Sequence, residues 1–405
     1  MKKFLLNKNR NYIIVTQFIN AIIALTTGKL IAIYILPEDF GTYNIQFATY
    51  TFFSTLLISP FVQFIKATNK TLLPKIGSKQ YIGLVIFIMG ITYFLFISFL
   101  YFYYDIFDFL LYVVFLLFMV LSTFNSIIGN YLNINNQIID FSKLSIVKSF
   151  SGLIFIFIFF IFGLQFMDDT QVLWLMQLMG VIMACIFFVS KYKLFKTRFK
   201  IGYGSFFKKY MRFAGPLIFM AIWSWINNYF DRYAIEYYLS TKEVGIYNAS
   251  YGVGSKFFLM LSPIFMILLI PLVYQVAKKE QKKKAIGKYS FIYFLIGIPI
   301  LGGIYIFKDS IGGLLLSGAY AEGFYLIFWV ALAFFALTLA YIYESYFYAE
   351  ERTKIILVGN IISAITNILL NIILIPRYGV LGAAIASCIG FTAHFGVMFY
   401  NFKRI

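Results

Sequence analysis

The chain has 405 residues, of which 61% are hydrophobic and only 12% charged, with a formal net charge of +18. A soluble domain could not bury so much apolar surface, whereas a lipid bilayer accepts it. The single histidine, His394, excludes a histidine-based metal cluster or catalytic triad. The sequence also lacks the Gly-x-x-x-x-Gly-Lys-[Ser/Thr] phosphate loop, so we expect no ATP hydrolysis by that route. Composition therefore predicts an integral membrane protein. The short connections, which leave no room for a soluble domain, and the missing phosphate loop lead us to expect that it is not an enzyme and has no catalytic residues, metal site or cofactor.

About twelve apolar segments are long enough to cross a bilayer as helices. In chain order we expect them at residues 12–36, 43–65, 81–104, 109–132, 144–165, 171–190, 213–239, 244–274, 289–307, 324–348, 354–376 and 380–402. The predicted fold class is an all-α membrane protein of two six-helix lobes. A parallel repeat would relate the lobes by a pseudo-two-fold axis along the membrane normal, because six spans return the chain to the side where it began.

The basic residues gather in every second connection, for example Lys66–Lys79 and Lys278–Lys288. By the positive-inside rule this places both termini in the cytoplasm of a multi-pass protein. The same residues would attract anionic membrane lipids, which explains the net charge without a nucleic-acid partner. A basic linker at 191–212 would divide the chain into an N-terminal lobe at 1–190 and a C-terminal lobe at 213–405.

A short internal repeat supports this division. Gly41-Thr42-Tyr43-Asn44 and Gly245-Ile246-Tyr247-Asn248 lie 204 positions apart, about half the chain length. An offset of 203 instead aligns Leu36 with Leu239 and Lys29 with Arg232. This second alignment predicts a cation at matching positions of the first and seventh spans.

Charges inside the predicted spans are the main functional candidates: Lys29, Asp231, Arg232, Glu236, Lys256 and Glu344. Each costs about 2.5–3.5 kcal/mol if isolated at the bilayer centre, so each should face a partner or a watery cavity. We expect Lys29, Arg232 and Lys256 to bind an anionic head group, since Lys and Arg both bind phosphate oxygens.

The carboxylates have two interpretations. Asp231 and Glu236 flank Arg232 and could simply neutralise it, or they could serve ion coupling. Glu344 lies among tyrosines and fits either a structural carboxylate or a proton site. His394 is interpreted as a packing residue, because no charged residue lies near it in sequence.

Polar and aromatic residues surround Arg232 in the sequence. Asn227, Asn228, Tyr229 and Tyr233 offer the hydrogen bonds and stacking surfaces that a sugar needs. A cationic, aromatic cavity in an otherwise apolar bundle favours an amphipathic substrate with an anionic head.

Several motifs carry a resemblance across nearly the whole chain. They are the turn Leu36-Pro37-Glu38-Asp39-Phe40-Gly41-Thr42-Tyr43, the triplet Asp231-Arg232-Tyr233, the segment Glu243-Val244-Gly245-Ile246-Tyr247, and the stretch from Asn360 to Asn371 followed by Ile375-Pro376-Arg377-Tyr378-Gly379-Val380-Leu381-Gly382-Ala383-Ala384-Ile385-Ala386. In their order and spacing the sequence resembles the Wzx-type O-antigen and capsule flippases of the multidrug/oligosaccharidyl-lipid/polysaccharide exporter superfamily. Of the site residues, only the Asp231-Arg232 position matches a family motif.

The resemblance implies a bacterial inner-membrane transporter that moves undecaprenyl-pyrophosphate-linked oligosaccharide from the cytoplasmic to the outer leaflet. It implies alternating access of two lobes about a central cavity and a role in surface polysaccharide biosynthesis. Other polysaccharide-assembly membrane proteins become candidate partners. From this reading we expect Arg232→Ala or Lys29→Ala to abolish glycan export while the protein stays inserted.

Three rival functions stay open. An ion-coupled drug/cation antiporter of the same superfamily would need acidic residues within its lobes, where this chain has Lys29 and Lys256. A lipid II flippase would usually have fourteen helices, two more than predicted. A membrane polysaccharide polymerase, a different class, typically needs a sizeable outer loop, and the predicted outer connections are short.

Overall fold

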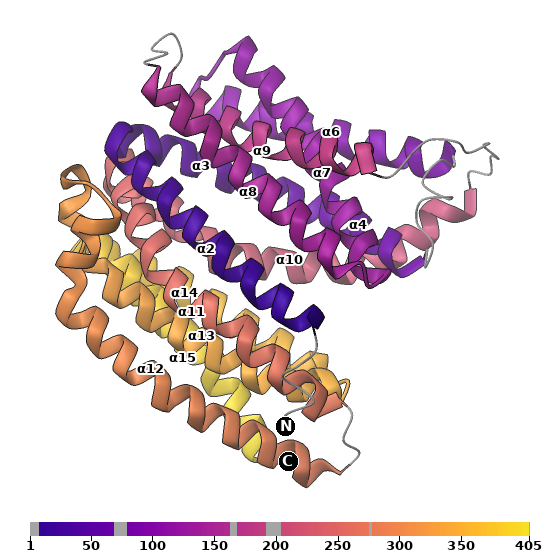
Figure 1. Ribbon diagram of the computed structural model, residues 1–405, viewed down its shortest axis with the longest axis vertical. Helices are drawn as coiled ribbons and strands as arrows, with labels where there is room; N and C mark the ends of the chain where they lie inside the picture. The colour runs from indigo at the N-terminus through magenta and orange to yellow at the C-terminus, as the bar shows by residue number, and fades with distance from the viewer. Residues whose placement is uncertain (1–7, 69–78, 163–167, 192–203, 275–277, 405) are drawn as a thin grey trace. The chain divides into compact units, whose positions relative to one another are not determined.

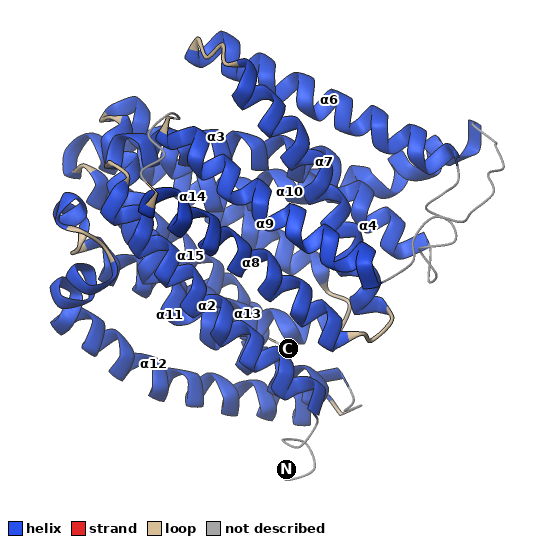
Figure 2. Cartoon of the chain, turned by 45° about the horizontal axis from the view of Figure 1, so that its top comes forward, coloured by secondary structure: helices blue, strands red, loops and turns tan. Residues whose placement is uncertain are grey.

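The computed structural model describes residues 8–68, 79–162, 168–191, 204–274 and 278–404, and all regular structure in these residues is helical (Figures 1 and 2). The predicted N-terminal tail and most of the predicted linker lie outside them. The helices are α2 (Lys8–Tyr34), α3 (Pro37–Phe53), the π-helical turn η1 (Ser54–Ile58), α4 (Ser59–Thr68), α6 (Lys79–Tyr104), α7 (Phe109–Ile134), α8 (Ile138–Ile161), α9 (Asp169–Lys191), α10 (Gly204–Tyr238), α11 (Thr241–Tyr274), α12 (Lys279–Leu315), the 3-10 helix η2 (Gly318–Gly323), α13 (Leu326–Ala349), α14 (Thr353–Tyr378) and α15 (Val380–Lys403).

Hydropathy located the membrane helices correctly. Most of each of the twelve predicted spans falls on one helix or, for the second span, on the continuous run α3–η1–α4; residues 163–165 of the fifth span lie outside the described residues. Among the described residues, 11 helices are long and apolar enough to cross a bilayer. The predicted seventh span lies in α10, which is not among them because polar residues such as Ser224, Asn227 and Asn228 lower the hydropathy of its charge-free stretch at 213–230. An all-α membrane fold is confirmed.

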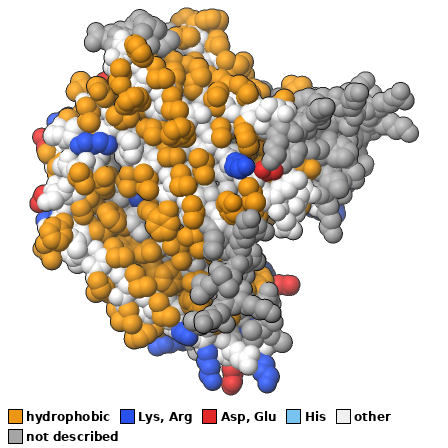
Figure 3. Space-filling model, viewed as in Figure 1, with side chains coloured by type: hydrophobic (Ala, Val, Ile, Leu, Met, Phe, Trp, Pro, Cys, Tyr) orange, Lys and Arg blue, Asp and Glu red, His pale blue; other side chains and the backbone are white. Residues whose placement is uncertain are grey.

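The surface agrees with a lipid environment. On the face shown in Figure 3, hydrophobic side chains cover most of the described surface, and few charged side chains interrupt them. Large exposed side chains include Phe94, Phe102 and Ile306, each more than 60% exposed. Contiguous apolar surface of this kind is what lipid chains cover in a membrane.

The chain forms two compact units. The first comprises Met1–Ala24 and Gln46–Trp225, and the second comprises Leu25–Ile45 and Ile226–Ile405. These units differ from the predicted ranges 1–190 and 213–405, because the end of α2 and the start of α3 pack with the second unit. Helix α10 begins at Gly204, inside the predicted linker 191–212.

The first unit is built around one buried tryptophan. Trp174 on α9 is fully buried and donates its indole N–H to Gln46 Oε1 at 2.8 Å. Rings from α3 and α7 surround it, with Tyr50 at 5.9 Å and Phe115 at 4.6 Å between ring centroids. A tryptophan suits a membrane interior only when its N–H has a partner, and Gln46 supplies it.

The second unit is built around α13, whose apolar window is 78% buried. It packs against α11, α12 and α15, while α14 packs against α15. Phe335 of α13 stacks on Tyr293 of α12 and meets Phe258 of α11 edge-on, so one ring joins three helices. In Figures 1 and 2, α12 lies at the margin of this group of helices.

The internal repeat becomes a direct contact within the second unit. A Cβ on Gly41 would clash with the backbone carbonyl of Thr241, and a Cβ on Gly245 would clash with the carbonyl of Pro37. The same offset of 204 positions relates Pro37 to Thr241 and Gly41 to Gly245. Each repeat therefore presents its glycine to the first helical residue of the other, which is the reciprocal pattern of a two-fold contact. Glycine is required at both positions because the two backbones touch.

The structure also fixes the register of the repeat. Helices α2 and α10 end at Tyr34 and Tyr238, which are again 204 positions apart, so the predicted shift to 203 does not occur. Lys29 consequently matches Tyr233 and not Arg232. One residue turns a helical side chain by about 100°, so the predicted pairing of the two cations across the repeat is wrong.

Candidate functional site

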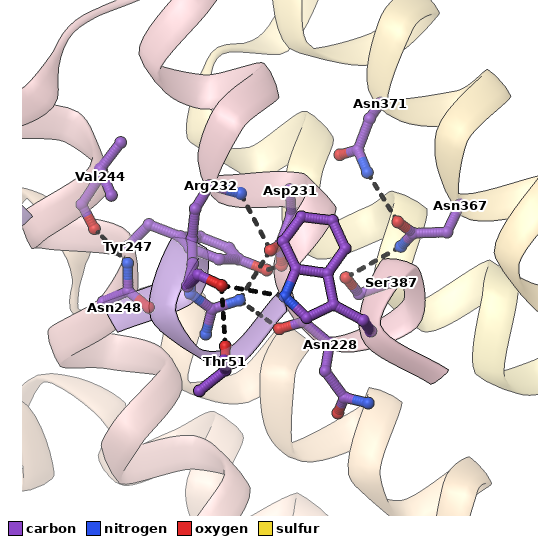
Figure 4. A network of polar contacts seen from close by, with 12 residues as sticks. Thr51, Asn228, Asp231, Arg232, Val244, Tyr247, Asn248, Asn367, Asn371 and Ser387 are labelled. Atoms are coloured by element: carbon purple, nitrogen blue, oxygen red, sulfur yellow. Dashed lines mark hydrogen bonds and ion pairs between the residues drawn. The ribbon is translucent and has the colours of Figure 1, made fainter. Parts of the chain in front are cut away.

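The α10 charges form a closed cluster inside the second unit (Figure 4). Asp231 is 2% exposed and Arg232 is 6% exposed. Arg232 Nη1 lies 2.8 Å from Asp231 Oδ1 and also donates to the carbonyl of Asn228. Asp231 Oδ2 accepts a hydrogen bond of 2.6 Å from the hydroxyl of Tyr247 on α11. Both oxygens of the carboxylate are therefore used, and the charge of Arg232 is balanced where it lies.

Two tyrosine rings complete the cluster. The guanidinium carbon of Arg232 stands 4.9 Å from the ring centroid of Tyr229 and 5.0 Å from that of Tyr251. A cation held against aromatic faces is stabilised by their quadrupoles, most strongly where water is absent. Within the described residues, Arg232 Nη2 and Nε have no hydrogen-bond partner. Arg232 thus keeps donors that its neighbours do not use.

The four residues predicted to contact a sugar make different interactions within the protein. Asn227 is 6% exposed, donates to the carbonyl of Asn360 at 3.1 Å and accepts from Ser363 Oγ at 2.8 Å, which ties α10 to α14. Its amide is therefore already committed to α14. Asn228 contributes its carbonyl to Arg232, and Tyr229 contributes its ring. Tyr233 and Glu236 lie half-buried further along α10, and each has interactions within the protein.

A polar stripe runs along α14, and the sequence reading did not identify it as part of the site. Asn371 donates to Asn367 Oδ1 at 2.9 Å, and Asn367 donates to Ser387 Oγ of α15 at 3.3 Å (Figure 4). Asn371 Oδ1 is buried without a hydrogen-bond partner among the described residues. With Asn360 and Ser363 these residues follow helical spacing, and that spacing in an apolar span was the available signal.

Lys29 lies at the end of α12. Its ammonium donates to the carbonyl of Gly313 at 3.0 Å and to the carbonyl of Leu316, which is the C-cap residue. A cation at a helix C-terminus satisfies carbonyls that have no intrahelical partner and complements the helix dipole. Nearby, Tyr320 OH donates to the carbonyl of Ile35 at 2.9 Å. The structure therefore gives Lys29 a role in fastening α2 to α12.

Lys256 differs from Arg232 and Lys29 in having no polar partner among the described residues. It lies half-buried near the middle of α11, and no hydrogen bond, ion pair or ring contact joins it to any other described residue. It follows Tyr251, which touches Arg232, by five positions, which is about 7.5 Å along a helix axis. A cation at this depth without a protein partner is the kind of residue that meets a ligand or water.

Glu344 has an unexpected partner. His394 Nε2 on α15 lies 2.8 Å from Glu344 Oε1 on α13, and the two side chains are only 2% and 9% exposed. The atoms are not aligned for a hydrogen bond, so the contact is an ion pair when the imidazole is protonated. The histidine ring packs against Gly359 of α14, where a Cβ would clash with it. His394, interpreted from the sequence as a packing residue, thus has a charged neighbour in space, although fifty residues of chain separate the two groups.

The described residues contain no cluster of three or more His, Cys, Asp or Glu side chains that could hold a metal ion. The interior carboxylates Asp231 and Glu344 are instead engaged by Arg232 and His394. The structure therefore separates the six charged candidates into the Asp231–Arg232 pair, the capping Lys29, the Glu344–His394 pair, the half-buried Glu236 and the unpartnered Lys256.

Comparison with known proteins identifies a family and a relative of this chain. Residues 6–277 match the family model described as polysaccharide biosynthesis protein. One curated relative is the probable low-salt glycan biosynthesis flippase Agl15 of Haloferax volcanii, 23% identical over 56% of this chain and 48% of its own length. The chain thus aligns with about half of that relative.

Solved structures share the fold at low sequence identity. The lipid II flippase MurJ in an inward closed conformation has a TM-score of 0.71 and 18% identity, covering 96% of this chain and 87% of its own. An inward-facing multidrug resistance MATE family transporter of the MOP superfamily has a TM-score of 0.72 and 14% identity, covering 95% of this chain and 94% of its own.

A transporter from Pyrococcus furiosus, whose structure is described as having a binding pocket of reversed polarity, has a TM-score of 0.59 and 13% identity, covering 99% of this chain and 97% of its own. The family model spans more than half of the chain, and the structural neighbours share its two-lobed helical fold. This protein belongs to the polysaccharide biosynthesis protein family and has the fold of the MOP transporter superfamily.

Proposed function

We propose that this protein is a flippase that moves an undecaprenyl-pyrophosphate-linked oligosaccharide from the cytoplasmic to the outer leaflet of a bacterial inner membrane. The movement would occur by alternating access, and the product would feed surface polysaccharide biosynthesis such as O-antigen. Membership of the polysaccharide biosynthesis family and the likeness to Agl15 support a glycan substrate. The prevalence of Lys and Arg near the predicted cytoplasmic ends supports cytoplasmic termini.

The observation that carries the proposal is that Lys256, within an apolar helix, has no partner among the residues that the structure describes. A pyrophosphate must lose water to enter an apolar bundle, and a cation that is not already neutralised can replace that water. Arg232 supports Lys256 with the donors that Asp231 and Asn228 leave unused. Lys29 has a smaller place in this proposal, because the end of α12 already occupies its ammonium.

Two alternative functions fit less well. A drug/cation antiporter needs an available carboxylate, whereas Asp231 and Glu344 are held by Arg232, Tyr247 and His394. A glycan polymerase typically needs a large outer loop, and the predicted outer connections that the structure describes in full are short, such as those between α6 and α7 and between α10 and α11.

The proposal is tested by complementation of a strain that lacks the gene, with surface polysaccharide as the readout. Lys256→Ala should lose most surface glycan while the membrane fraction keeps its normal amount of protein. Lys256→Arg should retain a substantial part of the export, because it keeps the charge. Lys288→Ala is the matched control, since Lys288 is exposed on α12 and makes no hydrogen bond or ion pair with any other described residue. Normal surface glycan with Lys256→Ala would refute the assignment of Lys256 to the substrate.

A further inference from the structure

A second polar site lies in the first unit. Helices α7 and α8 are joined by a short turn and enclose an open cavity of about 370 Å³. Small-molecule pockets range from about 300 to 1,000 Å³, so this one would hold a small part of an oligosaccharide. Its polar lining is Asn125, Ser126, Asn130, Asn133, Ser145 and Lys148.

The lining is unusual for paired membrane helices. It combines three primary amides, two hydroxyls and one ammonium, and no carboxylate lines it. The side chains of Asn130 and Asn133 make no hydrogen bond to other described residues. Polar groups in a membrane segment are costly unless they face a partner or water, so their convergence indicates a site that is filled by solvent or ligand.

Lys148 is held in place while its charge stays available. Its backbone carbonyl and Cγ pack where Gly180 of α9 has no side chain, and a Cβ at Gly180 would clash with that carbonyl. Lys148 is half-buried, and no hydrogen bond or ion pair joins its ammonium to another described residue. It therefore supplies one uncompensated positive charge to the cavity.

Phe141 adds an aromatic ring to the lining, and Asn20 lies outside the lining but contacts the lining residue Ser145. Phe141 lies with its ring 3.6 Å from the Cβ position of Gly129, so the glycine leaves room for the ring at the cavity wall. Asn20 of α2 donates to Ser145 Oγ at 2.9 Å, and its own Oδ1 is buried with no partner among the described residues. An aromatic face, several amides and a single cation together match a polyhydroxylated ring that carries one negative charge.

We propose that this cavity binds a sugar residue bearing a single acidic group, with Lys148 on the acid and the asparagines on the hydroxyls. The inference deepens the proposed function by assigning part of the glycan, and not its pyrophosphate, to the α7–α8 cavity. A glycerophosphate head group of an anionic lipid presents related chemistry, a hydroxylated anion. The aromatic ring of Phe141 and the three amides in the lining favour the sugar.

The test measures binding to the purified full-length protein by saturation-transfer NMR, with glucuronate, glucose and glycerol 3-phosphate as separate probes. Wild-type protein should bind glucuronate more tightly than glucose or glycerol 3-phosphate. Lys148→Ala should weaken glucuronate binding by at least about tenfold, which is about 1.4 kcal/mol, because it removes the hydrogen bond between the ammonium and the carboxylate. Lys143→Ala is the control, since Lys143 is exposed on the same helix outside the lining and should leave the affinity unchanged.

A second variant guards against simple misfolding. Asn130→Asp preserves the volume of the side chain, and its carboxylate should weaken glucuronate binding while glucose binding stays within about twofold. The thermal midpoint of each variant is measured alongside. Glucuronate affinity that is unaffected by Lys148→Ala would overturn the proposal, and so would tighter binding of glycerol 3-phosphate than of glucuronate. Normal export by Lys256→Ala would refute the proposed role of Lys256 without changing these binding results. Failure of the proposed function and failure of the sugar-binding proposal can therefore be told apart.

Discussion

Two cations in adjoining helices of the second unit have opposite surroundings. Arg232 on α10 is 6% exposed, pairs with Asp231 at 2.8 Å and lies between two tyrosine rings. Lys256 on α11 has no partner among the described residues. Burial of a charge in a membrane helix therefore does not by itself identify a binding residue. What distinguishes the two cations is the presence of a counter-charge in the protein. A cation that is paired with a carboxylate mainly stabilises the fold, whereas a cation without such a partner is available to a ligand.

The largest effect is expected from removing the partner of Arg232. Asp231→Ala leaves a buried guanidinium without its counter-charge, and breaking a buried pair in this way costs about 3–5 kcal/mol. We expect a clear fall in the free energy of unfolding of the purified protein in detergent. Arg232→Met combined with Asp231→Ala should recover part of the loss.

Asp309→Ala is the control for this measurement. Asp309 lies 3.7 Å from Lys308 with its side chain 75% exposed, and exposed pairs contribute about 0–1 kcal/mol. If Asp231→Ala were as mild as Asp309→Ala, Arg232 would not depend on Asp231, and the contrast with Lys256 would disappear.

The Glu344–His394 pair offers a second example of a closed charge. Glu344→Leu and His394→Leu should each destabilise the protein by about 1–3 kcal/mol, since each leaves a buried polar group without its partner. A double-mutant cycle measured by thermal unfolding should show coupling of at least about 0.5 kcal/mol. Strict additivity would mean that the two groups do not interact.

The glycine contact between the repeats should respond to a single methyl group. Gly41→Ala and Gly245→Ala each place a Cβ against a backbone carbonyl, and overpacking of this kind costs about 1–3 kcal/mol. Gly302→Ala is the control, because its Cβ would meet nothing within 4 Å. We expect lower thermal stability only for the two contact glycines; equal stability of all three variants would contradict the close approach.

The smallest effect is expected at Lys29. Lys29→Met removes the ammonium that caps α12 and should cost about 0.3–1 kcal/mol, as for other cations at helix C-termini. Surface glycan should then fall less than with Lys256→Ala, in contrast to the complete loss that the sequence alone led us to expect. The unfolding midpoint and the surface polysaccharide of the same variants provide the comparison, and an export defect equal to that of Lys256→Ala would return Lys29 to the substrate site.

Local signals in the sequence were sufficient for the helices and their turns. Runs of apolar residues located the twelve spans, because each span's hydropathy is a property of adjacent residues. The repeated Gly-x-Tyr-Asn turns also indicated the internal repeat, but only the structure showed that Gly41 and Gly245 bring the two turns into contact.

Long-range pairings could not be predicted in the same way. Lys29 caps a helix that ends 286 positions later, and nothing near Lys29 in sequence indicates this. His394 meets Glu344 because α13 and α15 pack side by side. The one-residue error in the repeat register has the same origin, since aligning cations gave a chemically plausible match that the helix ends exclude.

The most direct test of the central claim measures where the lipid-linked oligosaccharide resides. Spheroplasts expressing wild-type protein, Lys256→Ala or Lys288→Ala are treated with periodate, which oxidises sugar diols but does not cross the membrane. We predict that wild type and Lys288→Ala leave oligosaccharide open to oxidation, whereas Lys256→Ala retains it in the inner leaflet at normal protein abundance. An oxidised fraction with Lys256→Ala equal to that of wild type would contradict the account.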